Sequence, residues 1–559
     1  MQLRKSGRYV LKFLTLTIIS LLVSNQSYSQ FNTIHIGGQV SDSLTGAGIN
    51  NVTIYITNVM TAQTDSTHTN ASGFWAFDLS FTSAERSSAF PEEFSVSQNY
   101  PNPFNPSTKI NLNIPERGSV KVQIVNAIGE IIDSYEEYLE KGSYSIQWNA
   151  KGSAGVYFIN VRAGNRSITR KMILTDRASG TGLTRFRQEN SVTSSISRQP
   201  ISHQNTNSIL ISLSKFGYMP YAEKANISGG EYFNHKLETI HSNSILADLH
   251  NDILEKMAAD STYHLADHHT NNHTDIPRLK AGGVDLQLFA VWVDPVKYAG
   301  NSYNQAEKMI GIFKSELNKN RESMGQAHTK AEALSLNKDH KIAAVMAVEG
   351  GHTIENDLEK LKNLYKYGMR YFTLTWNNST NWAISAQDSL SETTGLSEFG
   401  KQVIRTLDSL GVIIDVSHTG IKTIKDVLSL TKNPIIASHS GARALRNHYR
   451  NLYDYQIKDI ASSGGVIGVV FYPPFLSAGN TNITTVANHI DYIVKVAGID
   501  HVAIGSDFDG IERTVTGLEN VTKFPELTLE LLRRRYSITE IRKILGENFL
   551  RVFEKVCGK

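Results

Sequence analysis

Ile245-Leu-Ala-Asp-Leu-His-Asn-Asp252 is a short apolar run that ends at two side chains capable of chemistry, His250 and Asp252. Seven more apolar or β-branched runs follow it, and segments with helical periodicity, such as Leu358–Tyr367, Lys401–Leu410 and Val486–Ala497, separate them. Continuous apolar runs are typical of parallel strands buried on both faces. The sequence therefore predicts an α/β fold, a (β/α)₈ TIM-type barrel over residues 240–559, whose catalytic residues lie at the C-terminal ends of its strands. The further runs are Val284–Val293, Ile342–Val348, Met369–Thr375, Val412–Val416, Pro434–Ala437, Val466–Tyr472 and His501–Ile504.

Five side chains at four of these strand ends have the chemistry of metal ligands. They are His250, Asp252, Glu349, His418 and His439. Alternation along an extended strand puts His250 and Asp252 on one face, toward the mouth of the barrel. The set is too large for one tetrahedral zinc with an open position, but it divides between two ions bridged by Glu349. We therefore expect two Zn²⁺ per chain. For any one of these histidines alone, a hydrogen-bonded core position is the alternative.

Several short motifs occur in order between about residues 243 and 557. Together they resemble those of the membrane (renal) dipeptidases, which are binuclear-zinc (β/α)₈ hydrolases of the amidohydrolase-like group. The resemblance implies that His250 and Asp252 hold one zinc, that His418 and His439 hold the other, and that Glu349 bridges them. The motifs include Asp248-Leu-His-Asn-Asp-Ile253, Ala347-Val-Glu-Gly-Gly-His-Thr-Ile354, Asp415-Val-Ser-His418, Ala437-Ser-His-Ser440, Arg450-Asn451 and Gly505-Ser-Asp-Phe-Asp-Gly510.

Two further positions acquire roles from this resemblance. Arg450 would receive the free carboxylate of a dipeptide, and Asp507 would carry protons at the scissile amide. The chemistry agrees, because two cations lower the pKa of a shared water from about 15.7 to about 7 and so make a bridging hydroxide a nucleophile at neutral pH. The alternatives are a loop-capping role for Asp507, with His352 as the next acid or base, and Arg443 or Arg446 as the carboxylate ligand.

One position departs from the family pattern. Where the best-known members place a histidine that helps to hold the carbonyl oxygen, this chain has Trp376, followed by Asn377 and Asn378. An indole offers one N–H donor and much more bulk, so the oxyanion role does not transfer to it unchanged. We expect Trp376 and Asn377 to contact substrate. Asn377 or Asn378 could supply the missing donor, and a purely steric role for Trp376 is the alternative.

The first 29 residues have the composition of a secretory signal peptide. Four basic residues precede the apolar stretch Phe13–Val23, and small polar residues follow it. The apolar stretch is short for a membrane span of about 20 residues, although an uncleaved anchor is an alternative. Cys557 is the only cysteine, so no intrachain disulfide forms. We expect an exported protein, either secreted or at the cell surface, with the periplasm as an alternative.

The segment between the signal peptide and the barrel has the pattern of small β-sandwiches. Residues 30–87 and 207–238 resemble the two parts of a carboxypeptidase-regulatory-like sandwich. Residues 88–178 resemble a type IX secretion sorting domain, and residues 179–206 are expected to be a linker. The sorting-like domain would then be inserted into a loop of the first sandwich, which exposed loops tolerate. Two separate sandwiches in tandem are the alternative.

The bulk composition fits an exported enzyme. A formal net charge of +3 over 559 residues favours neither a nucleic-acid groove nor a polybasic membrane patch. The sequence therefore predicts a zinc-dependent dipeptidase whose β-domains contact the cell surface or the secretion machinery. Another amide or lactone hydrolase on the same binuclear site is one alternative, and a catalytically inactive surface-binding protein is another. The oligomeric state stays open, with a homodimer as one option.

Overall fold

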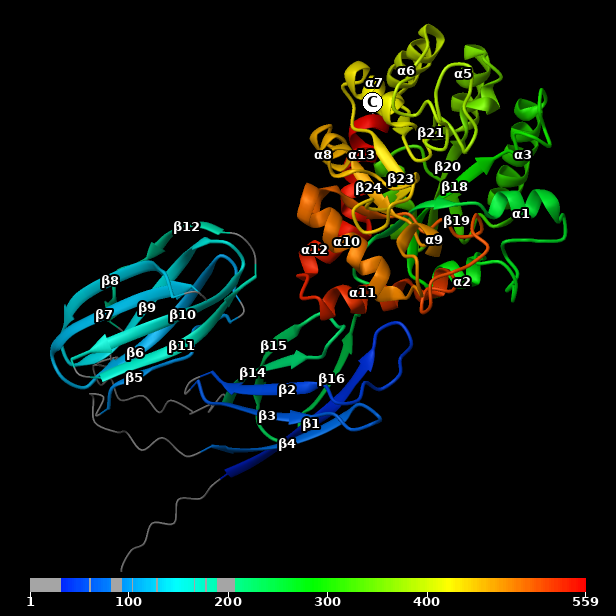
Figure 1. The fold of residues 1–559 in the computed structure, drawn as a ribbon. Helices are drawn as coiled ribbons and strands as arrows, with labels where there is room; N and C mark the ends of the chain where they lie inside the picture. Colours follow the sequence, from blue (N-terminus) through cyan, green and yellow to red (C-terminus); the bar gives the residue numbers. More distant parts are fainter. Residues whose placement is uncertain are drawn as a thin grey trace, which may run out of the picture.

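The computed structural model describes residues 32–59, 62–81, 93–102, 104–126, 129–164, 166–175, 178–188 and 207–558. The predicted signal peptide, residues 1–29, lies outside this range, as do residues 189–206 of the predicted linker. The described chain forms a barrel with helices around it and two β-sandwiches (Figure 1). Within the described residues, no helix is long and apolar enough to cross a membrane.

The barrel is a closed ring of eight parallel strands, as predicted. Its order is β18-β17-β25-β24-β23-β22-β21-β20, and β18 pairs with β20 to close it. A short extra strand, β19 (Met324–Gln326), pairs with the beginning of β20. The bounds are β17 (Leu246–Asn251), β18 (Val284–Trp292), β20 (Ile342–Glu349), β21 (Met369–Thr373), β22 (Ile413–Asp415), β23 (Ile436–Ser440), β24 (Val466–Val469) and β25 (Val502–Ile504).

Helices connect the strands and cover the outside of the barrel (Figure 1). Local signals set their ends, as in α6, where the Ser397 side chain accepts from the Gly400 N–H and Gly411 follows the last residue in a left-handed conformation. The helices are α1 (Ile253–Ala259), α2 (Ile276–Ala281), α3 (Ser302–Lys319), α4 (Lys330–Lys338), α5 (Leu358–Tyr367), α6 (Glu398–Leu410), α7 (Ile421–Leu430), α8 (Asp454–Ser462), α9 (Pro473–Leu476), α10 (Ile483–Ala497), α11 (Phe524–Arg533), α12 (Ile538–Arg542) and α13 (Asn548–Cys557).

The last helix, α13, packs against the beginnings of the barrel strands. Its Phe549 and Phe553 belong to the same buried cluster as Leu249 and Leu286 inside the barrel. The two rings stack with centroids 5.6 Å apart. The N-terminal end of the barrel is therefore an apolar core, and the opposite end is left for the polar strand ends.

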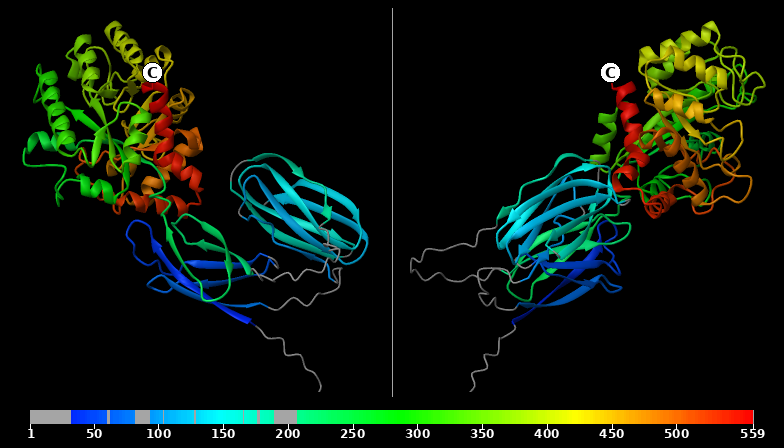
Figure 2. Two further views of the ribbon diagram at one scale, coloured as in Figure 1. Left: turned by 180° about the vertical axis from the view of Figure 1, so that it is seen from behind. Right: turned by 60° about the vertical axis from the view of Figure 1, so that its left-hand side comes forward.

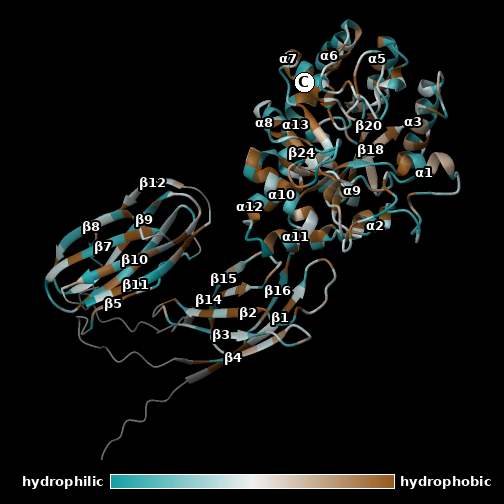
Figure 3. Ribbon diagram, in the orientation of Figure 1, coloured by the Kyte–Doolittle hydropathy of each residue, from teal (hydrophilic) through white to brown (hydrophobic). Residues whose placement is uncertain are grey.

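The first sandwich is built from strands on both sides of the second one in sequence. One sheet has the order β16-β1-β4 and the other β15-β14-β2-β3. Blue and green strands accordingly share one body in all three views (Figure 1, Figure 2). Apolar and polar residues alternate along several of these strands, such as β2 (Figure 3). The strands are β1 (Asn32–Asp42), β2 (Thr53–Asn58), β3 (Thr64–His68), β4 (Phe74–Phe81), β14 (Asn207–Ser214), β15 (Tyr221–Ile227) and β16 (Tyr232–Leu237).

The second sandwich packs its two sheets around Trp148, which is fully buried between Phe104 and Tyr157. One sheet has the order β11-β10-β7-β8 and the other β12-β9-β6-β5, with β13 also paired to β9. The strands are β5 (Ser95–Val96), β6 (Ser107–Ile114), β7 (Gly118–Asn126), β8 (Ile131–Leu139), β9 (Gly142–Gly152), β10 (Gly155–Ala163), β11 (Arg166–Leu174), β12 (Ala178–Leu183) and β13 (Arg187–Gln188).

This sandwich continues further along the chain than the sequence predicts. Residues 178–188, most of them expected to be linker, form β12 and β13 and pair with β9. The physical reason is that Leu183 and Phe186 pack against the apolar core of the sandwich, with the Phe186 ring 5.7 Å from that of Tyr135. Two such residues in a Ser/Thr/Gly-rich stretch give too weak a period for a strand to be predicted.

Candidate metal centre

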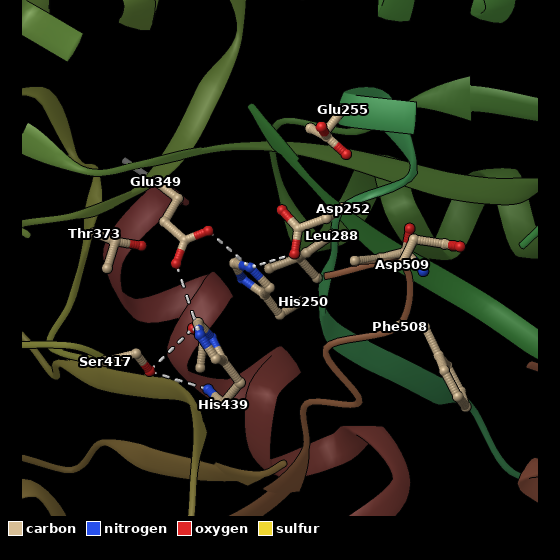
Figure 4. Close-up of polar contacts among 12 residues, drawn as sticks. His250, Asp252, Glu255, Leu288, Glu349, Thr373, Ser417, His439, Phe508 and Asp509 are labelled. Carbon is tan, nitrogen blue, oxygen red and sulfur yellow. Dashed lines mark hydrogen bonds and ion pairs between the residues drawn. The ribbon is translucent and has the colours of Figure 1, made fainter. Parts of the chain in front are cut away.

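The five predicted metal ligands meet at the C-terminal ends of the barrel strands. His250 lies near the end of β17, and Asp252 follows that strand directly. Glu349 is the last residue of β20, His418 follows β22, and His439 lies in β23. All five are buried. Figure 4 shows His250, Asp252, Glu349 and His439 pointing toward one another.

Glu349 lies between two pairs of potential ligands. Its Oε2 is 3.2 Å from Nε2 of His250, which in turn is 3.3 Å from Oδ2 of Asp252. Its Oε1 is 3.1 Å from Nε2 of His418 and 3.7 Å from Nε2 of His439. One carboxylate therefore presents one oxygen to each pair. This is the arrangement that a bridging ligand requires.

Hydrogen bonds direct the free electron pairs of two imidazoles into this cluster. The Asn377 side-chain oxygen accepts from His418 Nδ1 at 3.0 Å, and Ser438 Oγ lies 2.8 Å from His439 Nδ1. With the ring protons on Nδ1, the two Nε2 atoms face each other at 3.0 Å. Two lone pairs at that distance repel each other unless a cation lies between or beside them. His250 Nε2 and Asp252 Oδ1 are likewise buried without a hydrogen-bond partner among the described residues. This donor set fits divalent cations.

Electrostatics favour the protonation states that metal ligands need at Glu349, His418 and His439. At His250 burial acts to lower the pKa, but Tyr371 and the two neighbouring carboxylates outweigh it and raise that pKa well above its usual value. Burial acts to raise the pKa of Glu349, but His250 and His418 outweigh it and hold that pKa well below its usual range. Burial and the nearby Arg450 lower the pKa of His418 to about 4. Burial, together with His250 and Arg450, also lowers the pKa of His439 well below its usual value. An ionised carboxylate and neutral imidazoles bind metal without first losing a proton.

Asp507 lies on the loop after β25 and reaches the same cluster. One carboxylate oxygen and one nitrogen each of His250 and His439 lie within 4.8 Å of one another. Burial raises the pKa of Asp507 well above its usual value. Asp507 and His418 both have left-handed backbones, with φ of 64° and 63°. Strain of this kind at non-glycine residues is commonly found at functional sites.

Among the arginines named from the sequence, Arg450 lies closest to the cluster. It is buried, its Nη2 donates to the His439 carbonyl at 3.2 Å, and its Nε has no partner among the described residues. The guanidinium of Arg443 instead lies over the Tyr453 ring, 4.3 Å from its centroid. Arg446 donates from Nε to the Pro474 carbonyl. Only Arg450 therefore combines burial at the site with unused donor capacity.

Trp376 and Asn377 take different positions at the mouth. The Trp376 ring lies 6.3 Å from the His418 ring and 5.1 Å from the ring of Trp292. The Asn377 side-chain oxygen accepts a hydrogen bond from His418 Nδ1, as described above. Substrate contact by Asn377 stays a prediction, and its observed contact orients a histidine. His352, the alternative acid or base named from the sequence, donates from Nε2 to the Val293 carbonyl at 2.8 Å.

Several residues of the site have no predicted role in the sequence analysis. The Tyr371 hydroxyl lies 2.5 Å from His250 Nδ1. Asp415 accepts from Ser438, and Asp248 accepts from Ser506, both deep in the barrel. A signal for the two aspartates was present, because each is a charged residue within an otherwise apolar strand. Their partners are distant in sequence and could not be read from it.

Comparisons with known proteins agree with this geometry. Residues 234–558 match the family described as membrane dipeptidase, peptidase family M19. A curated relative, dipeptidase verJ from Clonostachys rogersoniana, is 33% identical over 294 residues, which are 51% of this chain and 76% of that protein. Residues 98–175 match the secretion system C-terminal sorting domain, which here lies before the barrel.

Two solved structures extend the comparison. The dipeptidase AC, a metallo peptidase of family M19, is 28% identical, with a TM-score of 0.54 over 56% of this chain and 99% of its own. A metallo peptidase from Rhodobacter sphaeroides, solved with a phosphinate mimic of the dipeptide L-Ala-D-Ala, is 27% identical, with a TM-score of 0.53 over 56% of this chain and 99% of its own.

Proposed function

Because the chain belongs to the membrane dipeptidase family, peptidase family M19, we propose that it hydrolyses the peptide bond of dipeptides at the cluster around Glu349. The observation that carries this proposal is the division of the Glu349 carboxylate, one oxygen facing His250 and the other facing His418. A buried carboxylate in this position adds nothing to apolar packing. In a binuclear hydrolase, by contrast, a group that faces both ions is needed.

The cofactor in this proposal is a pair of divalent cations, with zinc as the best match to imidazole and carboxylate donors. His250 and Asp252 would hold one ion, His418 and His439 would hold the other, and the Glu349 carboxylate, which faces both pairs, would serve both. When bound, the two ions supply Lewis acidity that polarises the scissile carbonyl and lowers the pKa of a water to about 7, which makes it a nucleophile at neutral pH.

Asp507 is the proton carrier in this account. It takes the proton from the attacking water and later delivers it to the leaving amine, acting first as base and then as acid. Its position beside His250 and His439 supports this role. Burial raises its pKa, which strengthens it as a base.

Arg450 is the recognition residue for the substrate carboxylate. A guanidinium offers a planar pair of N–H donors that matches a carboxylate, which an ammonium does not reproduce. Arg450 is buried, and its Nε is without a partner among the described residues, so a carboxylate would satisfy a donor that is otherwise unpaired. This contact would select free dipeptides over internal peptide bonds.

Trp376 gives the mouth an aromatic wall. Its contact with Trp292 and its position next to His418 support a role in confining the substrate side chain. This departure from the family's histidine favours a second candidate, hydrolysis of another amide or of a lactone at the same site.

Export of the enzyme is proposed on the sorting-domain match over residues 98–175 and on the composition of residues 1–29.

A panel of dipeptides tests the proposal. The purified protein, reconstituted with Zn²⁺, should release both amino acids from free dipeptides, and a chelator should abolish the activity. Dipeptides with an amidated C-terminus should be poor substrates, because Arg450 has no carboxylate to bind. Equal cleavage of free and amidated dipeptides would reject the dipeptidase assignment and favour the broader amide or lactone hydrolase.

A further inference from the structure

Inside the barrel, two aspartates each accept two hydrogen bonds from one serine, with the same geometry. Asp415, the last residue of β22, accepts the backbone N–H and the hydroxyl of Ser438 on β23, each at 2.8 Å. Asp248, on β17, accepts the same two groups from Ser506, just after β25, each at 2.7 Å. All four residues are buried. In each case the next residue in the chain belongs to the candidate site, since His439 follows Ser438 and Asp507 follows Ser506.

The two pairs differ in the second hydrogen-bond partner of the serine hydroxyl. Ser438 Oγ is 2.8 Å from Nδ1 of His439. Asp415 already accepts from the Thr373 hydroxyl at 2.7 Å and from the Ser417 N–H at 3.1 Å, in addition to the two groups of Ser438. Four donors around one carboxylate leave it acceptor-only, so the single hydroxyl proton of Ser438 goes to Asp415.

The position of the ring proton on His439 follows from this. Because Ser438 donates its proton to Asp415, its oxygen accepts from Nδ1–H of His439. A neutral imidazole has one ring proton, so Nε2 of His439 carries a lone pair. That atom faces Oε1 of Glu349 at 3.7 Å. Asp415 and Ser438 thus direct the lone pair of His439 toward the ligand cluster.

At the second pair no imidazole follows. Ser506 donates to Asp248, and its oxygen accepts from the backbone N–H of Phe508 at 3.2 Å. That contact spans Asp507, whose φ is 64°. Asp248 and Ser506 therefore shape the strained turn that carries the proposed proton carrier, and among the described residues neither side chain forms a hydrogen bond with the ring of a ligand histidine.

We propose that Asp415 and Ser438 form a relay that fixes the tautomer and orientation of His439, and that the matching pair Asp248 and Ser506 instead positions Asp507. The relay would set the metal affinity of the side of the cluster formed by His418 and His439. The second pair would affect turnover alone. All four are positioning residues, and the inference rests on the function proposed above.

The two serines allow a matched test in the full-length chain. Ser438→Ala and Ser506→Ala each remove one hydroxyl and leave the serine backbone N–H bonded to its aspartate. Metal affinity is measured for Zn²⁺ by competition with a chelator, and kcat and KM are measured on a dipeptide. Loss of a group that orients a ligand typically costs about 10- to 100-fold in metal affinity. We expect Ser438→Ala to weaken the binding of one of the two ions by this factor. Ser506→Ala should lower kcat and leave the affinities for both ions unchanged.

A conservative variant separates this role from a merely structural one. Ser438→Thr keeps the hydroxyl and should recover most of the metal affinity, and thermal melting of the metal-free proteins checks that each variant is folded. Wild-type metal affinity in Ser438→Ala, an equal loss in Ser506→Ala, or a folded Ser438→Thr that binds as weakly as Ser438→Ala would overturn the relay. A wild-type chain that binds only one ion would instead refute the two-ion site, and the same comparison on that ion would still decide the relay.

Discussion

The two ends of the barrel are built from opposite kinds of residue. At the N-terminal end every barrel strand begins with an apolar side chain, and α13 adds Phe549 and Phe553 to the buried cluster that includes Ile413, Ile436 and Val466. At the C-terminal end the strands stop at histidines and carboxylates that are just as deeply buried. The apolar beginnings are Leu246, Val284, Ile342, Met369, Ile413, Ile436, Val466 and Val502.

This difference separates residues that stabilise the fold from residues that serve chemistry. Buried apolar area at the N-terminal end contributes to the free energy of folding. At the mouth, His250 Nε2 and Asp252 Oδ1 are buried without a hydrogen-bond partner among the described residues, and His418 and Asp507 have strained, left-handed backbones. Features of this kind cost stability, and a ligand explains why the fold keeps them. Substitutions at the mouth should therefore change function, and those at the opposite end should change stability.

The largest effect is expected at the mouth, from Asp507→Asn. Asparagine has a similar volume and tolerates a left-handed backbone, but it cannot carry a proton. General acid–base catalysis contributes about 10²- to 10⁴-fold, so kcat should fall by that factor. Metal content and thermal stability should stay close to those of the wild type. Normal turnover would move the acid–base role elsewhere, with His352 as the next residue to test.

At the opposite end, Phe553→Ala should act on stability alone. Phe553 is fully buried and stacks on Phe549, so its truncation leaves a cavity in the core. Such changes lower the free energy of unfolding by about 3–5 kcal/mol. Urea denaturation measures the loss, and kcat and KM of the folded fraction should match the wild type. A changed KM in the folded variant would show that the two ends are not independent.

Arg450→Ala should reduce the recognition of dipeptides. Loss of a charge-assisted hydrogen bond costs about 1.5–3 kcal/mol, which corresponds to about 10- to 100-fold or more in kcat/KM. The loss should disappear for C-terminally amidated dipeptides. Arg443→Ala is the matched control, because that guanidinium lies over the Tyr453 ring and its Nε donates to the Asn447 side chain. A similar loss in both variants would contradict the assignment of the carboxylate to Arg450.

The smallest effect concerns Asp285, a carboxylate near the beginning of β18. Burial raises its pKa to about 6, and its oxygen accepts from the Leu246 N–H. Since its folded pKa lies above the unfolded value of about 3.9, its contribution to stability is greatest below that value and is lost as the pH rises through about 6. Relative to Asp285→Asn, the wild type should therefore lose about 2 kcal/mol between pH 4 and pH 7, because one pKa unit corresponds to about 1.4 kcal/mol. Parallel stability curves for the two proteins over that range would contradict this account.

The sequence predicts the barrel well because its signals are local. Each of the eight apolar runs overlaps an observed strand, and the predicted helix at Leu358–Tyr367 is α5 itself. Long periodic segments specify their own structure. β12 and β13 were not predicted, because these strands depend on the packing of Leu183, the last residue of β12, and Phe186, just before β13, against the core of the second sandwich.

The interior of the site is less predictable for the same reason. Asp415 and Ser438 are 23 residues apart, and His250 and Tyr371 are 121 residues apart, so no local pattern links them. Asn377 is a further example, because its position after a strand suggested an oxyanion donor. The fold directs its oxygen to His418, a contact that the sequence does not predict, and donation by its NH₂ group stays a prediction. Ligand types can be predicted from strand ends, but the contacts that orient them require the structure.

The central claim is that one carboxylate, Glu349, serves two metal ions at the mouth. The direct measurement is the number of divalent ions bound per chain after reconstitution with Zn²⁺ and dialysis, in the wild type and in Glu349→Gln. We expect two ions in the wild type and the loss of both in Glu349→Gln, because its two oxygens face the two ligand pairs. His418→Ala should mainly lose one ion. One ion or none in the wild type, or two tightly bound ions in Glu349→Gln, would contradict the account.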